Sequence, residues 1–532
     1  MKREMTTLDF IDRAVDLYDD VPGMVAHDGT EYTYAEVNDR INKLAHGLAD
    51  IGVEQGDRVA ILSPNTHYFI ESLFATNKLG ATTVPLNYRL TPGGYEYILS
   101  DCGAETIIAD YDYAGKVEEI RDEIPAETFI GYRSEEIAGG WTDYESFIEG
   151  NSTAEPDRPG ISEDDEATIN YTSGTTGDPK GVVRTHRTEH WHALVLNQHM
   201  EIRDDDTYLW TLPMFHANGW GHTYAITGTG GTHVCQRTFD AQGVFERVRE
   251  YDVSYMCGAP TVLNNLIKYH EQEDDLVTTG DRDVRIATAG SAPATATIET
   301  VEDEFDWRII HIYGLTETAP IVTTSNSPRR LAQRGRDLKV KQGFETLATD
   351  VRVVDEGGND VARDGATIGE IVVAGNQVMD RYLNKPEITE EAFNDRLEGY
   401  FHTGDLATID EDGMVSIQDR KKDIIISGGE NISSIQVEDV LYDHPDVLKA
   451  AVVPVPSDEW GETPKAVVVP RDGTDPDASE IIDFVRDRLA HFKAPTSVDF
   501  VDDLPETATG KVQKYELRDR YWDDEEARVG HE

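Results

Sequence analysis

The most constraining feature of this 532-residue chain is one loop, residues 171–181, which reads Tyr-Thr-Ser-Gly-Thr-Thr-Gly-Asp-Pro-Lys-Gly. Its hydroxyl groups, closely spaced glycines and single lysine offer O–H donors, open backbone N–H groups and a mobile cation. A polyphosphate needs these groups, because glycines let the backbone approach the anion. The spacing does not fit a Walker A motif. A solvated turn is the competing interpretation, and the position of the lysine favours a phosphate-binding loop.

The chain is strongly acidic, with 102 Asp and Glu against 48 Lys and Arg and a formal net charge of −54. This charge repels nucleic acids and anionic membranes, so we expect neither as a partner. The acidic residues form short dispersed clusters, such as residues 163–166 and 204–206. Dispersed charge of this kind is typical of proteins that work in concentrated salt, where screening removes self-repulsion. We therefore expect a halophilic source.

Cysteine usage and hydrophobicity indicate a cytoplasmic protein. Cys102, Cys235 and Cys257 form neither a disulfide framework nor a Cys-x-x-Cys pair, which fits a reducing compartment. The first residues contain no long apolar stretch, so we expect no signal peptide. No run of about 18 apolar residues is present, so we expect no membrane span. The oligomeric state is left open, with a homodimer as one option.

Helix and strand patterns alternate along the first part of the chain, which predicts an α/β fold. A helical pattern over residues 34–51 precedes a strand at Arg58–Leu62, and a helix over 69–79 precedes a strand over 81–85. Such alternation predicts parallel sheets covered by helices. Similar strand patterns recur at residues 104–109, 232–236 and 254–258.

The pattern changes after about residue 340, where short runs between glycines predict a β-rich subdomain at about 340–418. Beyond the charged junction at residues 419–423, a small α+β pattern follows. It has helices at 435–444 and 479–489 and strands at 450–454 and 466–470. A chain of this length is too long to fold around one simple hydrophobic core, so it is expected to form more than one domain. We expect an N-terminal domain over 1–420, rich in parallel βα sheets, and a small mobile C-terminal domain over 421–532.

The 171–181 loop resembles the phosphate-binding signature of the AMP-forming acyl-activating superfamily, which contains acyl-CoA synthetases, peptide-synthetase adenylation domains and luciferases. Five more segments resemble other signatures of this superfamily, in the same order along most of the chain. They are Leu212–Trp220, Ala289–Pro293, Tyr313–Thr318, His402–Leu406 and Pro505–Val512. Each segment is weak alone, but their shared order leaves little room for chance.

The resemblance implies an ATP site with four catalytic residues, Lys511, Thr316, Glu317 and His216. Lys511 would be the catalytic lysine, Thr316 would bond the α-phosphate, and Glu317 would hold Mg²⁺. A lysine, a threonine and a metal-binding glutamate suit this reaction. When an anionic carboxylate attacks an anionic nucleotide, the negative charge that gathers at the α-phosphorus must be neutralised.

Other residues would bind the nucleotide itself. Tyr313 would stack on adenine, and Asp405 would accept hydrogen bonds from the ribose hydroxyls. Taken singly, the tyrosine could be core packing and the aspartate could start a turn. The remaining implied nucleotide-binding positions are Thr172, Ser173, Gly174, Thr175, Thr176, Gly177, Lys180, Gly290, Ser291, Gly314 and Arg420.

The Met-Phe-His-Ala-Asn-Gly-Trp run at residues 214–220 resembles the acyl-pocket segment of enzymes that act on short- and medium-chain acids. His216 would lie near the carboxylate, and Trp220 would shorten the acyl tunnel. A core histidine and a core tryptophan are the competing interpretations.

The junction at residues 419–431 resembles a hinge followed by a loop that meets pantetheine. Lys422 matches the hinge, while Gly428, Gly429 and Asn431 would face coenzyme A. Adjacent glycines allow the close approach of a thin ligand. A basic cluster in so acidic a chain also favours an anionic ligand.

The sequence predicts an ATP-dependent acyl-CoA synthetase that forms AMP, with Mg²⁺ and coenzyme A. One alternative is an aryl or other carboxylate–CoA or carrier ligase of the same superfamily, and another is a non-catalytic nucleotide-binding protein. A luciferase-like oxygenase rests on the fold alone. His186-Arg-Thr-Glu-His190 matches a zinc hydrolase pattern, which we set aside because zinc needs a further ligand and an open position.

Overall fold

The computed structural model describes most of the chain. It leaves out residues 1–2, 134–138, 173–178, 274–275, 291–292, 327–330, 332–334, 336–337, 395, 429, 458–459, 472, 507–511 and 523–532, and the side chain of residue 431. The chain divides into two compact units, Met1–Asp350 with Val373–Asn394, and Val351–Val372 with Asp395–Glu532. The domain boundary expected near residue 420 stays a prediction.

The first unit contains two large, mainly parallel sheets. Described strands of one sheet follow the order β16-β15-β14-β13-β12-β10-β11-β1-β2. From β14 to β1 neighbouring strands run parallel, and antiparallel pairs lie at both edges. The strands are β1 (Pro22–Val25), β2 (Glu31–Thr33), β10 (Thr207–Trp210), β11 (Thr232–Cys235), β12 (Tyr255–Gly258), β13 (Val284–Thr288), β14 (Trp307–Tyr313), β15 (Thr323–Thr324) and β16 (Phe344–Glu345).

In the other sheet of this unit the described order is β19-β9-β8-β4-β3-β5-β6-β7. The pairs from β8 to β7 are parallel, whereas β8 with β9 and β9 with β19 are antiparallel. The strands are β3 (Arg58–Leu62), β4 (Thr82–Pro85), β5 (Thr106–Asp110), β6 (Thr128–Tyr132), β7 (Thr142–Asp143), β8 (Glu166–Thr172), β9 (Lys180–Thr185) and β19 (Arg381–Tyr382).

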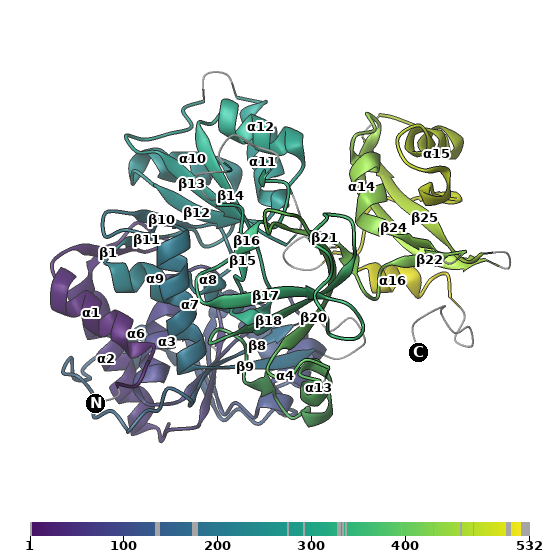
Figure 1. Cartoon of the computed structure of the whole chain (residues 1–532). Helices are drawn as coiled ribbons and strands as arrows, with labels where there is room; N and C mark the ends of the chain where they lie inside the picture. Colours follow the sequence, from purple (N-terminus) through teal and green to yellow (C-terminus); the bar gives the residue numbers. More distant parts are fainter. Residues whose placement is uncertain are drawn as a thin grey trace. The chain divides into compact units, whose positions relative to one another are not determined.

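Helices connect these strands, which confirms the predicted α/β alternation. The helix predicted over 34–51 begins at a capping box, in which the Thr33 hydroxyl accepts from the Glu36 N–H and the Glu36 carboxylate accepts from the Thr33 N–H. Figure 1 shows α11 and α12 beside β12–β14, where their apolar residues share a buried core. The helices are α1 (Leu8–Tyr18), α2 (Tyr34–Asp50), α3 (His67–Lys78), α4 (Pro92–Cys102), α5 (Ala114–Glu118), α6 (Tyr144–Ile148), α7 (His186–His199), α8 (Ala217–Trp220), α9 (His222–Thr229), α10 (Ala241–Glu250), α11 (Pro260–His270), α12 (Thr295–Asp303) and α13 (Pro386–Ala392).

The second unit carries most of a sheet in the order β17-β18-β20-β21, in which β20 and β21 pair antiparallel, and a small α+β fold. In the small fold, β22, β24, β25 and β26 enclose a core with α14 and α15. Its helices and strands confirm the pattern predicted after residue 423. The elements are β17 (Thr349–Val354), β18 (Gly369–Gly375), β20 (Phe401–Ile409), β21 (Val415–Arg420), β22 (Ile425–Ser427), β23 (Glu430–Ile432), α14 (Ser434–Tyr442), β24 (Val447–Ser457), β25 (Gly461–Pro470), α15 (Ala478–Arg486), β26 (Ser497–Phe500) and α16 (Lys514–Arg518).

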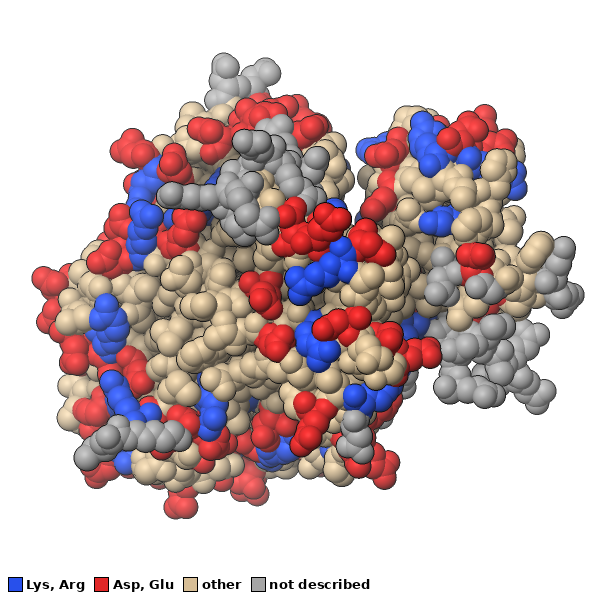
Figure 2. Space-filling model, in the orientation of Figure 1, with Lys and Arg blue, Asp and Glu red and all other residues tan. Residues whose placement is uncertain are grey.

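Among the charged residues, acidic side chains outnumber basic ones about two to one. Figure 2 shows Asp and Glu spread across the visible face, with fewer Lys and Arg among them. None of the described helices combines the length and the apolar character that a membrane crossing needs.

Candidate active site

The predicted phosphate loop connects two paired strands. Thr172 ends β8 and Lys180 begins β9, and the two residues face each other in the antiparallel register. Ser173, Gly174, Thr175, Thr176 and Gly177 lie outside the described residues. The register therefore places both ends of the loop side by side at one edge of the sheet.

A third segment, residues 379–383, joins this edge to the turn that carries Glu317. The Leu383 N–H donates to the Gly181 carbonyl at 2.8 Å, and the Asp380 N–H donates to the Val183 carbonyl at 3.0 Å. The Met379 N–H donates to the Glu317 carbonyl at 2.7 Å. Backbone hydrogen bonds thus hold the Glu317 turn close to β9.

Tyr382 brings the side chains of Lys180 and Glu317 to one place. Its hydroxyl donates to Glu317 Oε1 at 2.9 Å, and the Lys180 ammonium lies 5.1 Å from the centre of its ring. Burial, followed by the charge of Glu317, raises the pKa of Tyr382, so the hydroxyl stays a donor. No local motif marks Tyr382, and the sequence analysis did not identify it.

The Tyr313–Thr318 segment follows β14, next to the end of β13 in the same parallel sheet. Carboxyl ends of parallel strands are where ligands bind in open α/β sheets. Tyr313 is 8% exposed and Thr316 is 9% exposed, so both side chains are largely buried. A Cβ at Gly314 would lie 1.3 Å from the Pro320 carbonyl oxygen, so only glycine fits there.

Gly290 also lies beyond this sheet edge, two residues after β13 ends, with a positive φ of 97°. Such a backbone favours glycine and turns the chain sharply. Ser291 lies outside the described residues.

His216 and Trp220 follow β10, which pairs in parallel with β12 in the same sheet. Trp220 is 5% exposed, whereas His216 is partly exposed. Loss of hydration, reinforced by the Arg184 charge, lowers the pKa of His216 to about 4. The imidazole is therefore neutral near pH 7 and can accept or donate one hydrogen bond.

Asp405 and Arg420 lie together in the second unit. They face each other on β20 and β21, and Arg420 Nε lies 3.3 Å from Asp405 Oδ1. The Asp405 N–H donates to Thr403 Oγ1 at 3.1 Å, and the Gly404 N–H donates to Glu370 Oε1 at 3.2 Å. A carboxylate with an adjacent guanidinium suits a ribose with its hydroxyl donors.

The predicted hinge and coenzyme A segments lie just after β21. Lys422 is exposed in a turn, and its carbonyl accepts from Arg518 Nη1 at 3.2 Å. Gly428 connects β22 and β23 with a φ of 59°, and a Cβ there would lie 2.8 Å from the Trp460 ring. Gly429 and the Asn431 side chain lie outside the described structure.

Lys511 lies outside the described residues, but its neighbours are defined. Glu506 and Val512 pair in an antiparallel bridge. The Gln513 N–H also donates to the Pro505 carbonyl at 2.7 Å. The chain is therefore fixed on both sides of residues 507–511.

The structure also accounts for the His186–His190 pattern. His186 Nδ1 lies 2.9 Å from Thr7 Oγ1, His190 Nδ1 lies 2.9 Å from the Thr6 carbonyl, and Glu189 pairs with Arg184. Among the described residues, no group of three or more His, Cys, Asp or Glu could hold a metal. Mg²⁺ commonly uses one or two carboxylates and the phosphates of a substrate, so the single carboxylate of Glu317 is compatible with the expected ion.

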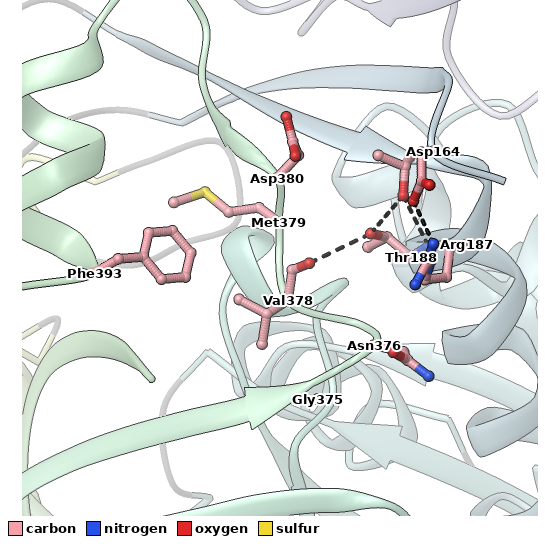
Figure 3. Close-up of a pocket in the computed structure, with 10 residues that line it drawn as sticks. Asp164, Arg187, Thr188, Gly375, Asn376, Val378, Met379, Asp380 and Phe393 are labelled. Atoms are coloured by element: carbon pink, nitrogen blue, oxygen red, sulfur yellow. Dashed lines mark hydrogen bonds and ion pairs between the residues drawn. The ribbon is translucent and has the colours of Figure 1, made fainter. Parts of the chain in front are cut away.

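Residues 378–380 help to line a pocket of about 320 Å³ on the first unit. Figure 3 shows the side chains that line it. Arg187 at its wall pairs with Glu163 and Asp164, and Thr188 Oγ1 donates to the Val378 carbonyl at 3.4 Å. No predicted site residue lines this pocket. Its lining residues are Asp164, Thr185, Arg187, Thr188, Gly375, Asn376, Val378, Met379, Asp380 and Phe393.

The loop, the Glu317 turn and the strand ends define a nucleotide-binding α/β enzyme, and comparison with known proteins gives its family. The chain matches the AMP-binding enzyme family over residues 11–383 and the AMP-binding enzyme C-terminal domain over residues 436–511. The chain belongs to the AMP-binding enzyme family.

Relatives of known name span nearly the whole chain. It is 39% identical to a probable peroxisomal acyl-activating enzyme 5 of Arabidopsis thaliana and 37% identical to a 2-methylpropanoate–CoA ligase of Humulus lupulus. Each match covers 97% of this chain and 95% of the relative. The crystal structure of ATP-bound MatB from Rhodopseudomonas palustris matches with a TM-score of 0.84 at 28% identity, over 97% of this chain and 99% of that one. These findings confirm the predicted class, an AMP-forming CoA ligase.

Proposed function

We propose that the protein activates a short- to medium-chain carboxylic acid with ATP and transfers the acyl group to coenzyme A. The observation that carries the proposal is the position of Tyr382 between Lys180, at the end of the phosphate loop, and Glu317. Because Tyr382 contacts both side chains, the Lys180 ammonium and the Glu317 carboxylate, which could hold a metal, lie in one region of the first unit.

In the first half-reaction a carboxylate oxygen of the acid attacks the α-phosphorus of ATP. The bond from that phosphorus to the bridging oxygen breaks, and pyrophosphate leaves with the electron pair. Lys180 and the 172–181 backbone bind the phosphates, Thr316 bonds the α-phosphate, and Lys511 supplies a positive charge to the pentacoordinate centre. Mg²⁺ held by Glu317 would neutralise charge on the phosphates.

In the second half-reaction the thiol sulfur of coenzyme A attacks the acyl carbon of the adenylate. The carbon–oxygen bond to AMP breaks, AMP leaves, and the thiol proton passes to solvent. We propose that the C-terminal domain turns about Lys422 between the two steps. Lys511 then withdraws, and Gly428, Gly429 and Asn431 bind pantetheine.

The acid is proposed to be small because of Trp220. Its buried indole lies in the segment after β10, close along the chain to the neutral His216. The hop relative named for 2-methylpropanoate supports a short branched or linear acid.

The source and setting of the protein are proposals as well. The net charge of −54 supports a halophilic source, and the three buried free cysteines support a reducing cytoplasm. A homodimer is proposed for solution, which a mass measurement at high salt would test.

A panel of carboxylic acids tests the proposal. Release of AMP and pyrophosphate is measured for linear acids of two to twelve carbons, branched acids and aromatic acids, with and without coenzyme A. The proposal expects equal amounts of AMP and acyl-CoA, with the highest kcat/KM among short and medium chains. Formation of ADP, or a preference for long or aromatic acids, contradicts it.

A further inference from the structure

The segment that carries Trp220, labelled α8 above, does not have the backbone of a right-handed helix. Five consecutive residues, Ala217–Gly221, have φ between 49° and 76°, so the chain makes a left-handed turn. For residues with a side chain this conformation is strained, because the Cβ approaches the following carbonyl oxygen. Ala217, Asn218 and Trp220 are such residues, and all three are buried. The surroundings must therefore hold the turn.

Asn218 is the side chain through which the turn is held. Its Nδ2 donates to Glu189 Oε1 on α7 at 3.1 Å. Its Oδ1 accepts from Thr168 Oγ1 and Asn170 Nδ2 on β8, each at 3.4 Å. Its carbonyl accepts from Thr223 Oγ1 at 3.2 Å. One buried side chain thus fastens the left-handed turn to a strand and to a helix.

A buried ion pair lies behind Asn218. Arg184 Nη2 and Glu189 Oε1 are 2.8 Å apart, and both side chains are fully buried. Arg184 Nη2 also donates to Asn170 Oδ1. Within the described structure, Arg184 Nε and Nη1 and Glu189 Oε2 have no hydrogen-bond partner. A buried pair with unpaired atoms gives little net stability, because desolvation offsets the attraction.

The turn itself fits with no space to spare. A Cβ at Gly219 would lie 2.2 Å from the Trp210 ring, and one at Gly221 would lie 2.6 Å from His192 Nδ1. The position of the turn therefore depends on the Trp210 and His192 rings as well as on the hydrogen bond from Asn218 to Glu189.

We propose that the Arg184–Glu189 pair, acting through Asn218, is a positioning device that fixes Trp220 and so limits the length of the acid that the enzyme accepts. This inference rests on the proposed role of Trp220 in the acyl pocket. None of the three polar residues is a catalytic residue, because they act on the substrate only through the turn.

Two variants test the device. Glu189→Gln keeps an acceptor for Asn218 but removes the charge that pairs with Arg184. Asn218→Gly removes the hydrogen bonds, while glycine keeps the left-handed backbone without strain. Glu71→Gln is the matched control, because Glu71 is a carboxylate of 1% exposure paired with Arg40 away from the turn.

The readout is the ratio of kcat/KM for an acid two carbons longer than the best substrate to that for the best substrate. Glu189→Gln and Asn218→Gly are expected to raise this ratio about tenfold, mainly through a lower KM for the longer acid. Glu71→Gln is expected to lower the melting temperature and leave the ratio unchanged. If Trp220→Gly raises the ratio but neither turn variant changes it, the positioning role of the ion pair is wrong and the acyl-pocket role of Trp220 stands. An unchanged ratio in Trp220→Gly overturns the acyl-pocket role of Trp220 and the inference with it.

Discussion

Tyr382 donates a hydrogen bond of 2.9 Å to Glu317, although 65 residues separate them in the chain. Its ring also faces the Lys180 ammonium. A neutral hydroxyl that donates to one carboxylate oxygen fixes the orientation of the carboxylate and leaves the other oxygen to bind a metal. We therefore propose that the tyrosine positions Glu317 as the Mg²⁺ ligand.

Tyr382→Phe should weaken the response to Mg²⁺. The ring and its contact with Lys180 remain, and only the hydrogen bond to a charged group is lost, so AMP release at limiting Mg²⁺ should fall about tenfold. Titration of AMP release with Mg²⁺ measures the effect, and saturating metal should restore most of the rate. Tyr442→Phe, which removes a hydroxyl that donates to the Ala450 carbonyl in the second unit, is the control. Equal Mg²⁺ curves for both variants and the wild type would exclude this role.

Lys511→Ala should separate the two half-reactions. Loss of one charge-stabilising donor slows adenylation by at least about 10²-fold. Thioester formation from preformed acyl-AMP should be largely spared, because the ammonium is proposed to act only at the phosphorus. Single-turnover assays of each half-reaction measure both rates. Equal damage to the two rates would refute the assigned role.

Acid should destabilise the fold through its buried histidines. Burial lowers their pKa, so they stay neutral in the folded state while the unfolded chain takes up protons below pH about 6.5. Their contribution to stability is present above pH 6.5 and is lost as the pH falls towards 4. Burial raises the pKa of Glu71 and Glu189, that of Asp439 to about 6 and that of Glu438 to about 7, which acts in the opposite direction, but the histidines outnumber these acids. The pKa is lowered to about 3 for His67 and His233, to about 4 for His186, His222 and His311, and well below 6.5 for His192.

Urea unfolding measures this effect at pH 6.5, 5.5 and 4.5, at a fixed high salt concentration that screens surface charge. The free energy of unfolding should fall by on the order of 1 kcal/mol or more per pH unit. A constant or rising free energy over this range would show that the buried histidines do not control acid stability.

Removal of salt should inactivate the protein reversibly. The net charge of −54 repels itself when screening is lost, so activity and the circular dichroism of the fold should decline together as salt is diluted. Readdition of salt should restore both signals. Full activity after desalting would contradict the halophilic origin.

The sequence predicted the elements that depend on local patterns. The apolar period over residues 34–51 and the strand at 58–62 correspond to α2 and β3, because a helix or strand face is encoded within a few residues. The order of short motifs also identified the family, since each motif keeps its own residues together.

The contacts between distant segments could not be predicted in this way. Tyr382 meets Glu317, and Asn218 meets Glu189, only because separate strands and helices converge, and no local pattern records that convergence. The Asn-Gly-Trp-Gly run at 218–221 held a partial signal for a left-handed turn, because glycine and asparagine tolerate positive φ. The buried pair behind it had no signal, since Arg184 and Glu189 look like ordinary charged residues.

The central claim is tested most directly by the exchange of labelled pyrophosphate into ATP in the absence of coenzyme A. The exchange is measured with and without a carboxylic acid substrate. The exchange reports reversible attack at the α-phosphorus, where Glu317 and the 171–181 loop are proposed to act. We predict exchange that requires a short- or medium-chain acid and falls at least about 10²-fold in Glu317→Gln. Exchange that does not depend on the acid, or that survives in Glu317→Gln, would contradict the account.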